Sequence, residues 1–201
     1  MARGWPVLLR SDDVVLRPLR RRDAGAWRAA RARNAAWLER WEATSPDPQT
    51  GPPPTFGGFV RTLAAQGRAG AALPFAIEYR DELVGQLTVA TIVHGSAGTA
   101  SIGYWVSEHV AGRGIAPTAV AMAVDHCFGE VGLHRVEIAI RPENAPSLRV
   151  VAKLGLREEG LRERYLHIQG AWRDHRTFAV TVEEVPEGLL TRWRRSRTTP
   201  V

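Results

Sequence analysis

The chain has 201 residues, enough for one domain with a full hydrophobic core, and its 44% hydrophobic content is normal for a globular protein. Its formal net charge is +6, almost all of it from arginine because Lys153 is the only lysine, and a basic surface favours partners that carry phosphates. No apolar run could span a membrane or serve as a signal-peptide core, and the six histidines lack metal-ligand spacing.

The N-terminal part of the chain predicts an arm, a strand and two helical segments. Residues 1–12 form the arm, and a β-branched run at 14–19 predicts the first strand. Asp23 is a candidate N-cap for a helix through about Arg33. The helical pattern continues over 35–41, where Trp37 and Trp41 are one turn apart and are assigned to the core.

A proline-rich segment at 44–54 cannot be a helix or a central strand, and we interpret it as a mobile loop or a passive linker. A short helix is then predicted from Phe59 to about Arg68. Strands at 74–79 and 83–93 flank a turn, and a third antiparallel strand ends at Val106.

The stretch from Gly103 to Leu156 predicts strand, loop, helix, strand and helix. Gly112 and Gly114 precede an apolar helix, so their loop can direct several N–H groups at one anion, such as a phosphate. An ordinary tight turn is the alternative interpretation. Cys127 lies on the apolar face of this helix, which favours a core position over a catalytic thiol.

After the strand at 135–140, Asn144 opens a short helix that Gly155 closes. Residues 160–169 and 172–183 predict the two strands of a final hairpin. We therefore expect one domain over residues 1–185 and a basic C-terminal tail over 186–201. The tail carries Arg192, Arg194, Arg195 and Arg197.

Four motifs occur in a fixed order within this stretch. They are Gly112-Arg113-Gly114-Ile115-Ala116, Gly132-Leu133-His134-Arg135, Pro142-Glu143-Asn144-Ala145-Pro146-Ser147 and Lys153-Leu154-Gly155-Leu156. Residues 13–183 thereby resemble the GNAT acetyltransferase superfamily and, within it, the RimJ/RimL group that acetylates protein N-termini. The resemblance implies the GNAT acyl-CoA N-acyltransferase fold, an α/β fold with a mixed, largely antiparallel central sheet flanked by helices. It also implies a V-shaped gap between the strands at 101–107 and 134–140.

The resemblance implies that acetyl-CoA is the acyl donor and that no metal is needed. The residues expected to bind acetyl-CoA are Trp105, Val106, Ala111, Gly112, Arg113, Gly114, Ile115, Ala116, Asn144 and Ser147. The backbone N–H of Val106 is the expected oxyanion donor, and Ser147 the expected proton donor to the departing thiolate. At Ala111 the chain departs from relatives that carry Gln or Arg there, a change that leaves the backbone amides in place.

The general base is less well defined by the resemblance. Glu163 is the preferred candidate and Glu137 the alternative, while Ala139 stands where some N-terminal acetyltransferases carry a glutamate. Tyr165, Trp172 and Asp174 either shape the acceptor mouth or pack the hairpin. By resemblance, Trp37 and Trp41 border the acceptor cleft.

These expectations converge on a cytoplasmic, acetyl-CoA-dependent N-acetyltransferase acting on the N-terminal α-amino group of a protein, such as a ribosomal protein. The alternatives are acetylation of a small amine, such as an antibiotic or metabolite, and a non-catalytic acyl-CoA-binding module. The basic tail adds an expected weak contact with the ribosome or its RNA. No membrane partner is expected, and the oligomeric state is left open.

Overall fold

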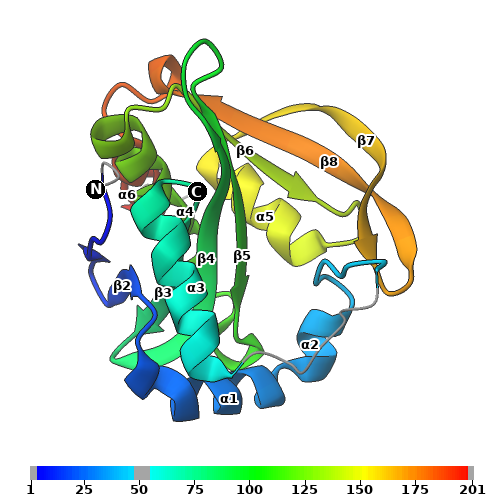
Figure 1. Ribbon diagram of the computed structural model, residues 1–201. Coiled ribbons are helices and arrows are strands. Elements are labelled where there is room, and N and C mark those ends of the chain that lie inside the picture. The colour runs from blue at the N-terminus through cyan, green and yellow to red at the C-terminus, as the bar shows by residue number, and fades with distance from the viewer. Residues whose placement is uncertain (1–3, 48–54, 199–201) are drawn as a thin grey trace.

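The computed structural model describes residues 4–47 and 55–198 and shows one mixed sheet between two layers of helices (Figure 1). The strands are β1 (Leu9–Ser11), β2 (Val14–Pro18), β3 (Leu73–Tyr79), β4 (Glu82–Val93), β5 (Thr99–Val106), β6 (Arg135–Ile140), β7 (Arg157–Ile168) and β8 (Ala171–Thr181). The helices are α1 (Ala24–Arg33), α2 (Ala35–Glu39), α3 (Phe56–Ala69), α4 (Ile115–His126), α5 (Ala145–Leu154) and α6 (Leu189–Thr198).

The eight strands form one sheet in the order β1-β2-β3-β4-β5-β6-β8-β7. Neighbouring strands are antiparallel except β5 and β6, which are parallel. The predicted α/β class with a mixed, largely antiparallel sheet is therefore confirmed.

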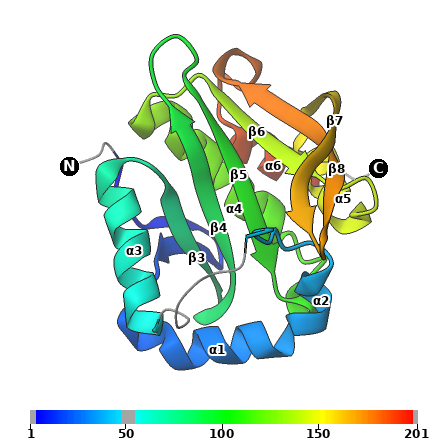
Figure 2. The same ribbon diagram turned by 45° about the vertical axis from the view of Figure 1, so that its right-hand side comes forward.

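The single parallel pair is also where the sheet opens. β5 and β6 are paired only from Thr99 opposite Arg135 to Ser101 opposite Glu137, although β5 continues to Val106. Figure 2 shows the two strands close together at one end and apart at the other. Beyond Ser101, this edge of β5 has no strand partner in the described sheet, so its backbone N–H and C=O groups can pair with an extended ligand.

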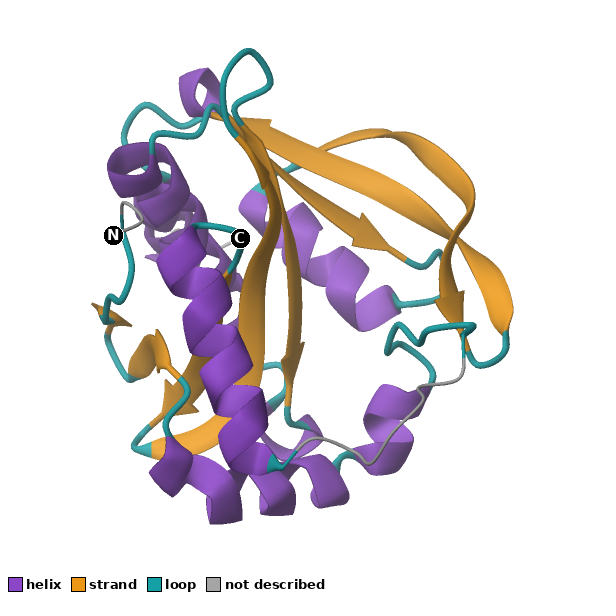
Figure 3. Cartoon of the chain, in the orientation of Figure 1, coloured by secondary structure: helices purple, strands orange, loops and turns teal. Residues whose placement is uncertain are grey.

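Helices cover both faces of the sheet (Figure 3). α4, α5 and α6 pack against one face in the larger apolar cluster, and α1 and α3 pack against the other in a smaller cluster with Trp105. α4 is nearly all apolar and is buried from Ile115 to Val124 except at Ala116, as expected for a helix between a sheet and a further helix. Cys127 is fully buried beside it, and burial raises the pKa of its thiol to about 12, so the thiol belongs to the core.

The two chain ends contain elements that the sequence patterns did not predict. Residues 9–11 of the expected arm form β1, and residues 189–198 of the expected tail form α6, whose Leu189 and Trp193 are buried against α4 and α5. The expectation of a tail is therefore wrong for this segment. Residues 48–54 of the proline-rich segment lie outside the described residues.

The carboxylate of Asp23 does not cap α1 as the sequence suggested. It accepts hydrogen bonds from the buried Arg17 guanidinium at 2.7 and 3.0 Å and from the Arg20 N–H at 2.7 Å. Arg17 also contacts Glu78 on β3, so this ion-pair network joins β2, β3 and the start of α1.

Candidate active site

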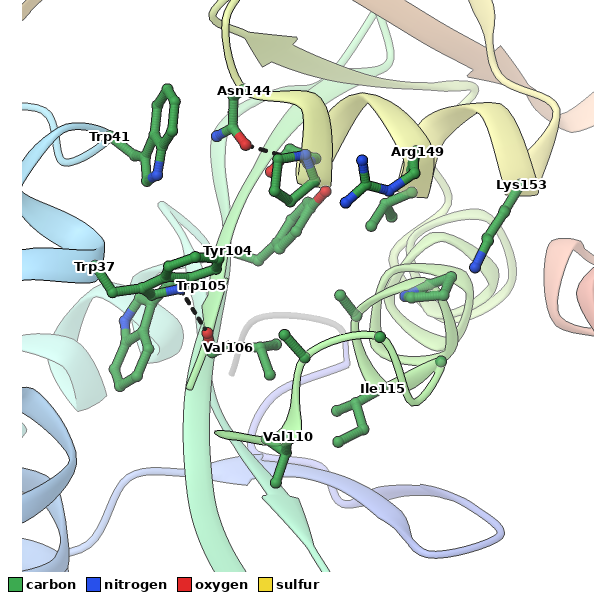
Figure 4. Close-up of a pocket in the computed structure, with 18 of the residues that line it drawn as sticks. Trp37, Trp41, Tyr104, Trp105, Val106, Val110, Ile115, Asn144, Arg149 and Lys153 are labelled. Atoms are coloured by element: carbon green, nitrogen blue, oxygen red, sulfur yellow. Dashed lines mark hydrogen bonds between the residues drawn. The ribbon is translucent and has the colours of Figure 1, made fainter. Parts of the chain in front are cut away.

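A cavity of about 200 Å³ lies where β5 and β6 separate (Figure 4). Its walls come from α2, the end of β5, the first turn of α4 and α5. The lining residues are Trp37, Leu38, Trp41, Tyr104, Trp105, Val106, Val110, Ala111, Gly112, Gly114, Ile115, Ala116, Pro117, Asn144, Pro146, Ser147, Arg149, Val150 and Lys153.

The glycine loop forms the wall at the N-terminus of α4. Gly112 and Gly114 have φ values of +83° and +82°, a backbone region that residues with a Cβ rarely adopt, and Gly114 is the N-cap of α4. The first N–H groups of an α-helix have no partner within the helix, and they carry the positive end of its dipole. This wall is therefore suited to a phosphate or pyrophosphate.

α5 forms the opposite wall and supplies charge. Arg149 and Lys153 are one turn apart on this helix, and both line the cavity. Within residues 4–47 and 55–198, neither side chain has an acidic partner within salt-bridge distance. The helix N-terminus and these two cations make the cavity attractive to an anionic ligand such as coenzyme A.

Asn144 and Ser147 are held together at the start of α5. The carboxamide oxygen of Asn144 accepts a hydrogen bond from the Ser147 N–H at 3.1 Å and thereby caps the helix. The Asn144 side-chain NH₂ has no partner among the described residues, so it remains available to a ligand in the cavity. Capping and ligand binding are thus compatible roles for this residue.

Tyr104 was not selected from the sequence, yet its side chain extends from β5 towards the first turn of α5 (Figure 4). Its hydroxyl is buried beside Ser147 and makes no hydrogen bond of good geometry within the described structure. Burial raises the pKa of Tyr104 to about 12, with Ser147 partly opposing the shift. The phenol is therefore a neutral O–H donor facing the cavity.

Three tryptophans line the cavity on the side of α2. Trp37 donates its indole N–H to the Val106 carbonyl at 3.3 Å, and the Trp41 ring lies beneath the guanidinium of Arg141. Trp105 packs edge-on against Trp27. The assignment of Trp37 and Trp41 to the core is therefore incomplete, since both face the cavity.

Two of the expected site residues do not line the cavity. The Arg113 guanidinium reaches the His109 carbonyl at 3.5 Å, and Glu163 is exposed on β7. Glu137, the alternative base, has its two carboxylate oxygens bound by Arg135 at 3.0 Å and Arg162 at 2.7 Å. None of the cavity-lining residues in the described parts of the chain carries a carboxylate or an imidazole.

The other expected residues all meet at the cavity. They are Trp105, Val106, Ala111, Gly112, Gly114, Ile115, Ala116, Asn144 and Ser147. The residues missed from the sequence include Tyr104, Arg149 and Lys153. The helical spacing of the last two on the helix that Asn144 opens was an available signal, whereas nothing local pointed to the Tyr104 hydroxyl.

Comparison with known proteins identifies the family. The family model described as "Acetyltransferase (GNAT) domain" matches residues 13–157. The chain belongs to the GNAT acetyltransferase family. The structure of Mycobacterium smegmatis RimJ in complex with CoA-disulfide has a TM-score of 0.88 and 44% sequence identity, covering 98% of each chain.

Curated relatives also match this GNAT chain. "[Ribosomal protein uS5]-alanine N-acetyltransferase" of Escherichia coli is 29% identical over 189 residues, covering 90% of this chain and 94% of the relative. "Probable N-acetyltransferase YjcK" of Bacillus subtilis is 38% identical over 100 residues, which span about half of this chain and 55% of that protein.

The described residues include no membrane-spanning helix and no cluster of metal-ligating side chains. No helix among the described residues has the length and apolarity required to cross a bilayer. No group of three or more His, Cys, Asp or Glu side chains within 4–47 and 55–198 is arranged to hold a metal ion.

Proposed function

We propose that the chain transfers the acetyl group of acetyl-CoA to the N-terminal α-amino group of a protein, and that a ribosomal protein is the acceptor. The observation that carries the proposal is the cavity, which links the glycine loop of α4 to Trp37 and Trp41 through the opening between β5 and β6. The names of the Mycobacterium and Escherichia relatives support this choice of donor and acceptor.

In this proposal, the donor is held by the backbone and by α5. N–H groups of the glycine loop, with Arg149 and Lys153, bind the phosphates, and the free end of the Asn144 carboxamide binds the pantetheine arm. Arg113 adds a contact with phosphate only after its side chain turns from the His109 carbonyl. Charge-assisted contacts of this kind are stronger than neutral ones.

Transfer requires a donor to the developing oxyanion and a proton for the leaving thiolate. The Val106 N–H serves as the oxyanion donor, a role worth about 3 kcal/mol in comparable acyl transfers. The amine nitrogen bonds to the acetyl carbon, the carbon–sulfur bond breaks, and the sulfur takes a proton from the Ser147 hydroxyl, which regains a proton from water as the amine releases its own to water. Since a thiol has a pKa of about 8.5, its thiolate is a fair leaving group and a weak acid suffices.

The amine must lose a proton, and the cavity offers no carboxylate to take it. We propose that water accepts the proton, with Glu163 on β7 as the group that later removes it. An α-amine has a pKa of about 7.7–8.0 and is partly neutral at pH 7, whereas lysine, near 10.4, has roughly 300-fold less neutral amine. The absence of a strong base at the site therefore favours an N-terminal acceptor.

The test compares two peptides of one sequence, one with a free N-terminus and no lysine, the other N-terminally blocked with one lysine. We expect kcat/KM to be at least about 100-fold higher for the free N-terminus. Comparable values would contradict the proposed acceptor. Activity on neither peptide, together with rapid acetylation of a small amine, would indicate the small-molecule enzyme. Binding of CoA with no transfer at all would indicate a non-catalytic module.

A ribosomal acceptor places the reaction in the cytoplasm, and a weak ribosome contact through α6 is part of the proposal. Arg192 donates to the carbonyls of Leu154, Gly155 and Glu184, and Arg195 pairs with Glu187, so contact with RNA is assigned to the exposed Arg197 of this helix. Replacing Arg197 by Gln is expected to lower the salt dependence of ribosome binding. An unchanged salt slope would contradict this contact.

A further inference from the structure

The bend between α1 and α2 is built around Asn34, which is 1% exposed. Its carboxamide nitrogen donates to the Ala30 carbonyl at 2.7 Å and to the Ser107 hydroxyl oxygen at 2.9 Å. Its carboxamide oxygen accepts the Glu108 N–H at 2.9 Å. The reversed carboxamide would set its oxygen against the Ala30 carbonyl oxygen and its NH₂ against the Glu108 N–H, so only the observed orientation fits both neighbours.

The same bend contacts a third consecutive residue at the end of β5. Trp37, which follows Asn34 by one helical turn, donates its indole N–H to the Val106 carbonyl at 3.3 Å. Val106, Ser107 and Glu108 are therefore each hydrogen-bonded by the α1–α2 bend. Ser107 is fully buried, and its N–H donates to the Val84 carbonyl of β4 at 2.7 Å.

These three residues join the two parts of the proposed reaction centre. Val106 carries the proposed oxyanion donor, and the turn that begins at Ser107 leads into the glycine loop. Two backbone hydrogen bonds close that turn. The Val110 N–H donates to the Ser107 carbonyl at 3.2 Å, and the Ala111 N–H donates to the Glu108 carbonyl at 3.0 Å. On the other side of the bend, Trp37 and Trp41 line the acceptor side of the cavity.

We propose that Asn34 is a positioning residue for acetyl transfer, which holds the backbone of residues 106–108 in place relative to α2. The inference rests on the proposed function, in which the Val106 N–H faces the acetyl carbonyl. Through Asn34, one buried carboxamide fixes both the oxyanion donor and the tryptophan side of the cavity. A displacement of about 1 Å at such a centre costs about 100-fold in rate.

The glycine loop is held by contacts that do not involve Asn34, so kcat and the affinity for CoA should respond differently when the bend is loosened. Gly114 and Thr118 are held within α4 and by α6, independently of Asn34. Variants that loosen the bend should therefore lower kcat for a peptide acceptor while leaving the dissociation constant of CoA within about threefold. A residue that only stabilised the fold would lower the folded fraction and leave kcat per folded, CoA-binding molecule unchanged.

The experiment uses Asn34→Ala, Ser107→Ala, their double variant and Trp37→Phe. We expect kcat per CoA-binding molecule to fall about 10- to 100-fold for Asn34→Ala and less for the other single variants. The double variant should resemble Asn34→Ala because both changes remove one shared contact. Ser101→Ala is the matched control, since this hydroxyl of the same strand donates to the Ala90 carbonyl at 3.2 Å, away from the bend.

A wild-type kcat in Asn34→Ala and Ser107→Ala would overturn the inference, as would equal losses in kcat and CoA binding. Ser107→Ala and Trp37→Phe keep the experiment decisive should Asn34→Ala fail to fold. A wild-type chain that acetylated no peptide would contradict the proposed function instead. Amide hydrogen exchange at residues 106–108 would then decide the inference, with faster exchange in Ser107→Ala supporting it and unchanged exchange overturning it.

Discussion

The indole N–H of Trp193 donates a hydrogen bond to the Thr118 hydroxyl oxygen at 2.9 Å. The Thr118 hydroxyl in turn donates to the Gly114 carbonyl at 2.8 Å, and Gly114 is the N-cap of α4. A Cβ placed on Gly114 would lie 3.4 Å from the Trp193 ring. The C-terminal helix therefore supports the first turn of α4, at the point where the glycine loop faces the cavity.

Replacing Trp193 by Phe should weaken CoA binding by about 3- to 10-fold, the effect of one lost hydrogen bond. Phenylalanine keeps a smaller aromatic ring against α4 but has no N–H, so the link to Thr118 is lost. Titration calorimetry with CoA measures the effect. Trp172→Phe is the matched control because Trp172 is 54% exposed on β8, and equal affinities for both variants would contradict this role of α6.

α6 also shows why part of the fold could not be predicted from the sequence. Its segment is rich in arginine, and its burial depends on Asp125 of α4, whose carboxylate accepts the N–H groups of Leu189 and Leu190 at 2.6 and 3.1 Å. These partners are more than 60 residues apart along the chain. α5, in contrast, is bounded by local signals, because Asn144 caps its start and Gly155 ends it at a φ of +66°.

The candidate site also contains some residues whose positions could be predicted from the sequence and others whose positions could not. Backbone positions of the glycine loop could be predicted because Gly112 and Gly114 report a local conformation. The position of Glu163 could not, because β7 has an irregular register between Arg162 and Leu166, where side-chain alternation along the strand is interrupted. The hydroxyl of Tyr104 faces Ser147 only through tertiary packing, which no sequence period encodes.

Replacing Gly85 by Ala should disturb the end of β5 and lower kcat. Gly85 on β4 is opposite Val106, and a Cβ there would lie 2.2 Å from the backbone carbonyl oxygen of Trp105. That oxygen belongs to the peptide whose N–H is the proposed oxyanion donor, so the strand must shift where catalysis needs it fixed. Overpacking of this kind also costs about 1–3 kcal/mol of stability.

Gly103→Ala is the matched control for this prediction. Gly103 is on the adjacent strand, and a Cβ there would have no neighbouring atom within 4 Å. We expect Gly103→Ala to keep both kcat and the melting temperature. A Gly85→Ala variant with wild-type kcat, measured well below its melting temperature, would show that the end of β5 tolerates displacement.

Replacing Tyr104 by Phe removes a buried hydroxyl that lacks a hydrogen-bond partner in the described structure. Burying such a hydroxyl lowers the free energy of unfolding by about 1–3 kcal/mol. Thermal and urea unfolding should therefore show equal or higher stability for the variant. Because the hydroxyl faces Ser147 in the cavity, kcat should fall at the same time. Lower stability with unchanged kcat would assign the hydroxyl to the core.

The pKa of Tyr104 fixes the pH dependence of this effect. With a pKa of about 12, the phenol stays protonated throughout the range in which the enzyme is assayed. The ratio of wild-type to Tyr104→Phe kcat should therefore be constant from about pH 6 to pH 10. A ratio that fell with rising pH within this range would indicate a phenol that ionises much earlier.

The last prediction concerns stability. Burial opposes ionisation of Asp23, but hydrogen bonds from the buried Arg17 guanidinium and the Arg20 N–H hold the pKa of this carboxyl below its usual value. A carboxylate with a depressed folded-state pKa stabilises the fold above its unfolded pKa, and this contribution disappears as the pH falls through the folded value. Asp23→Asn should cost about 3 kcal/mol at pH 7, because Arg17 then keeps only Glu78 as a charged partner.

Urea unfolding measures the free energy of unfolding of wild type and Asp23→Asn at pH 7 and at pH 3. The difference between the two proteins should be smaller at pH 3. Glu82→Gln is the matched control, since Glu82 pairs with Arg33 at the surface, where both side chains are about half exposed. Exposed pairs contribute about 1 kcal/mol or less, so this control should stay near wild type at both pH values. A pH-independent cost for Asp23→Asn would mean that the ionised carboxylate of Asp23 is not what stabilises the junction of β2, β3 and α1.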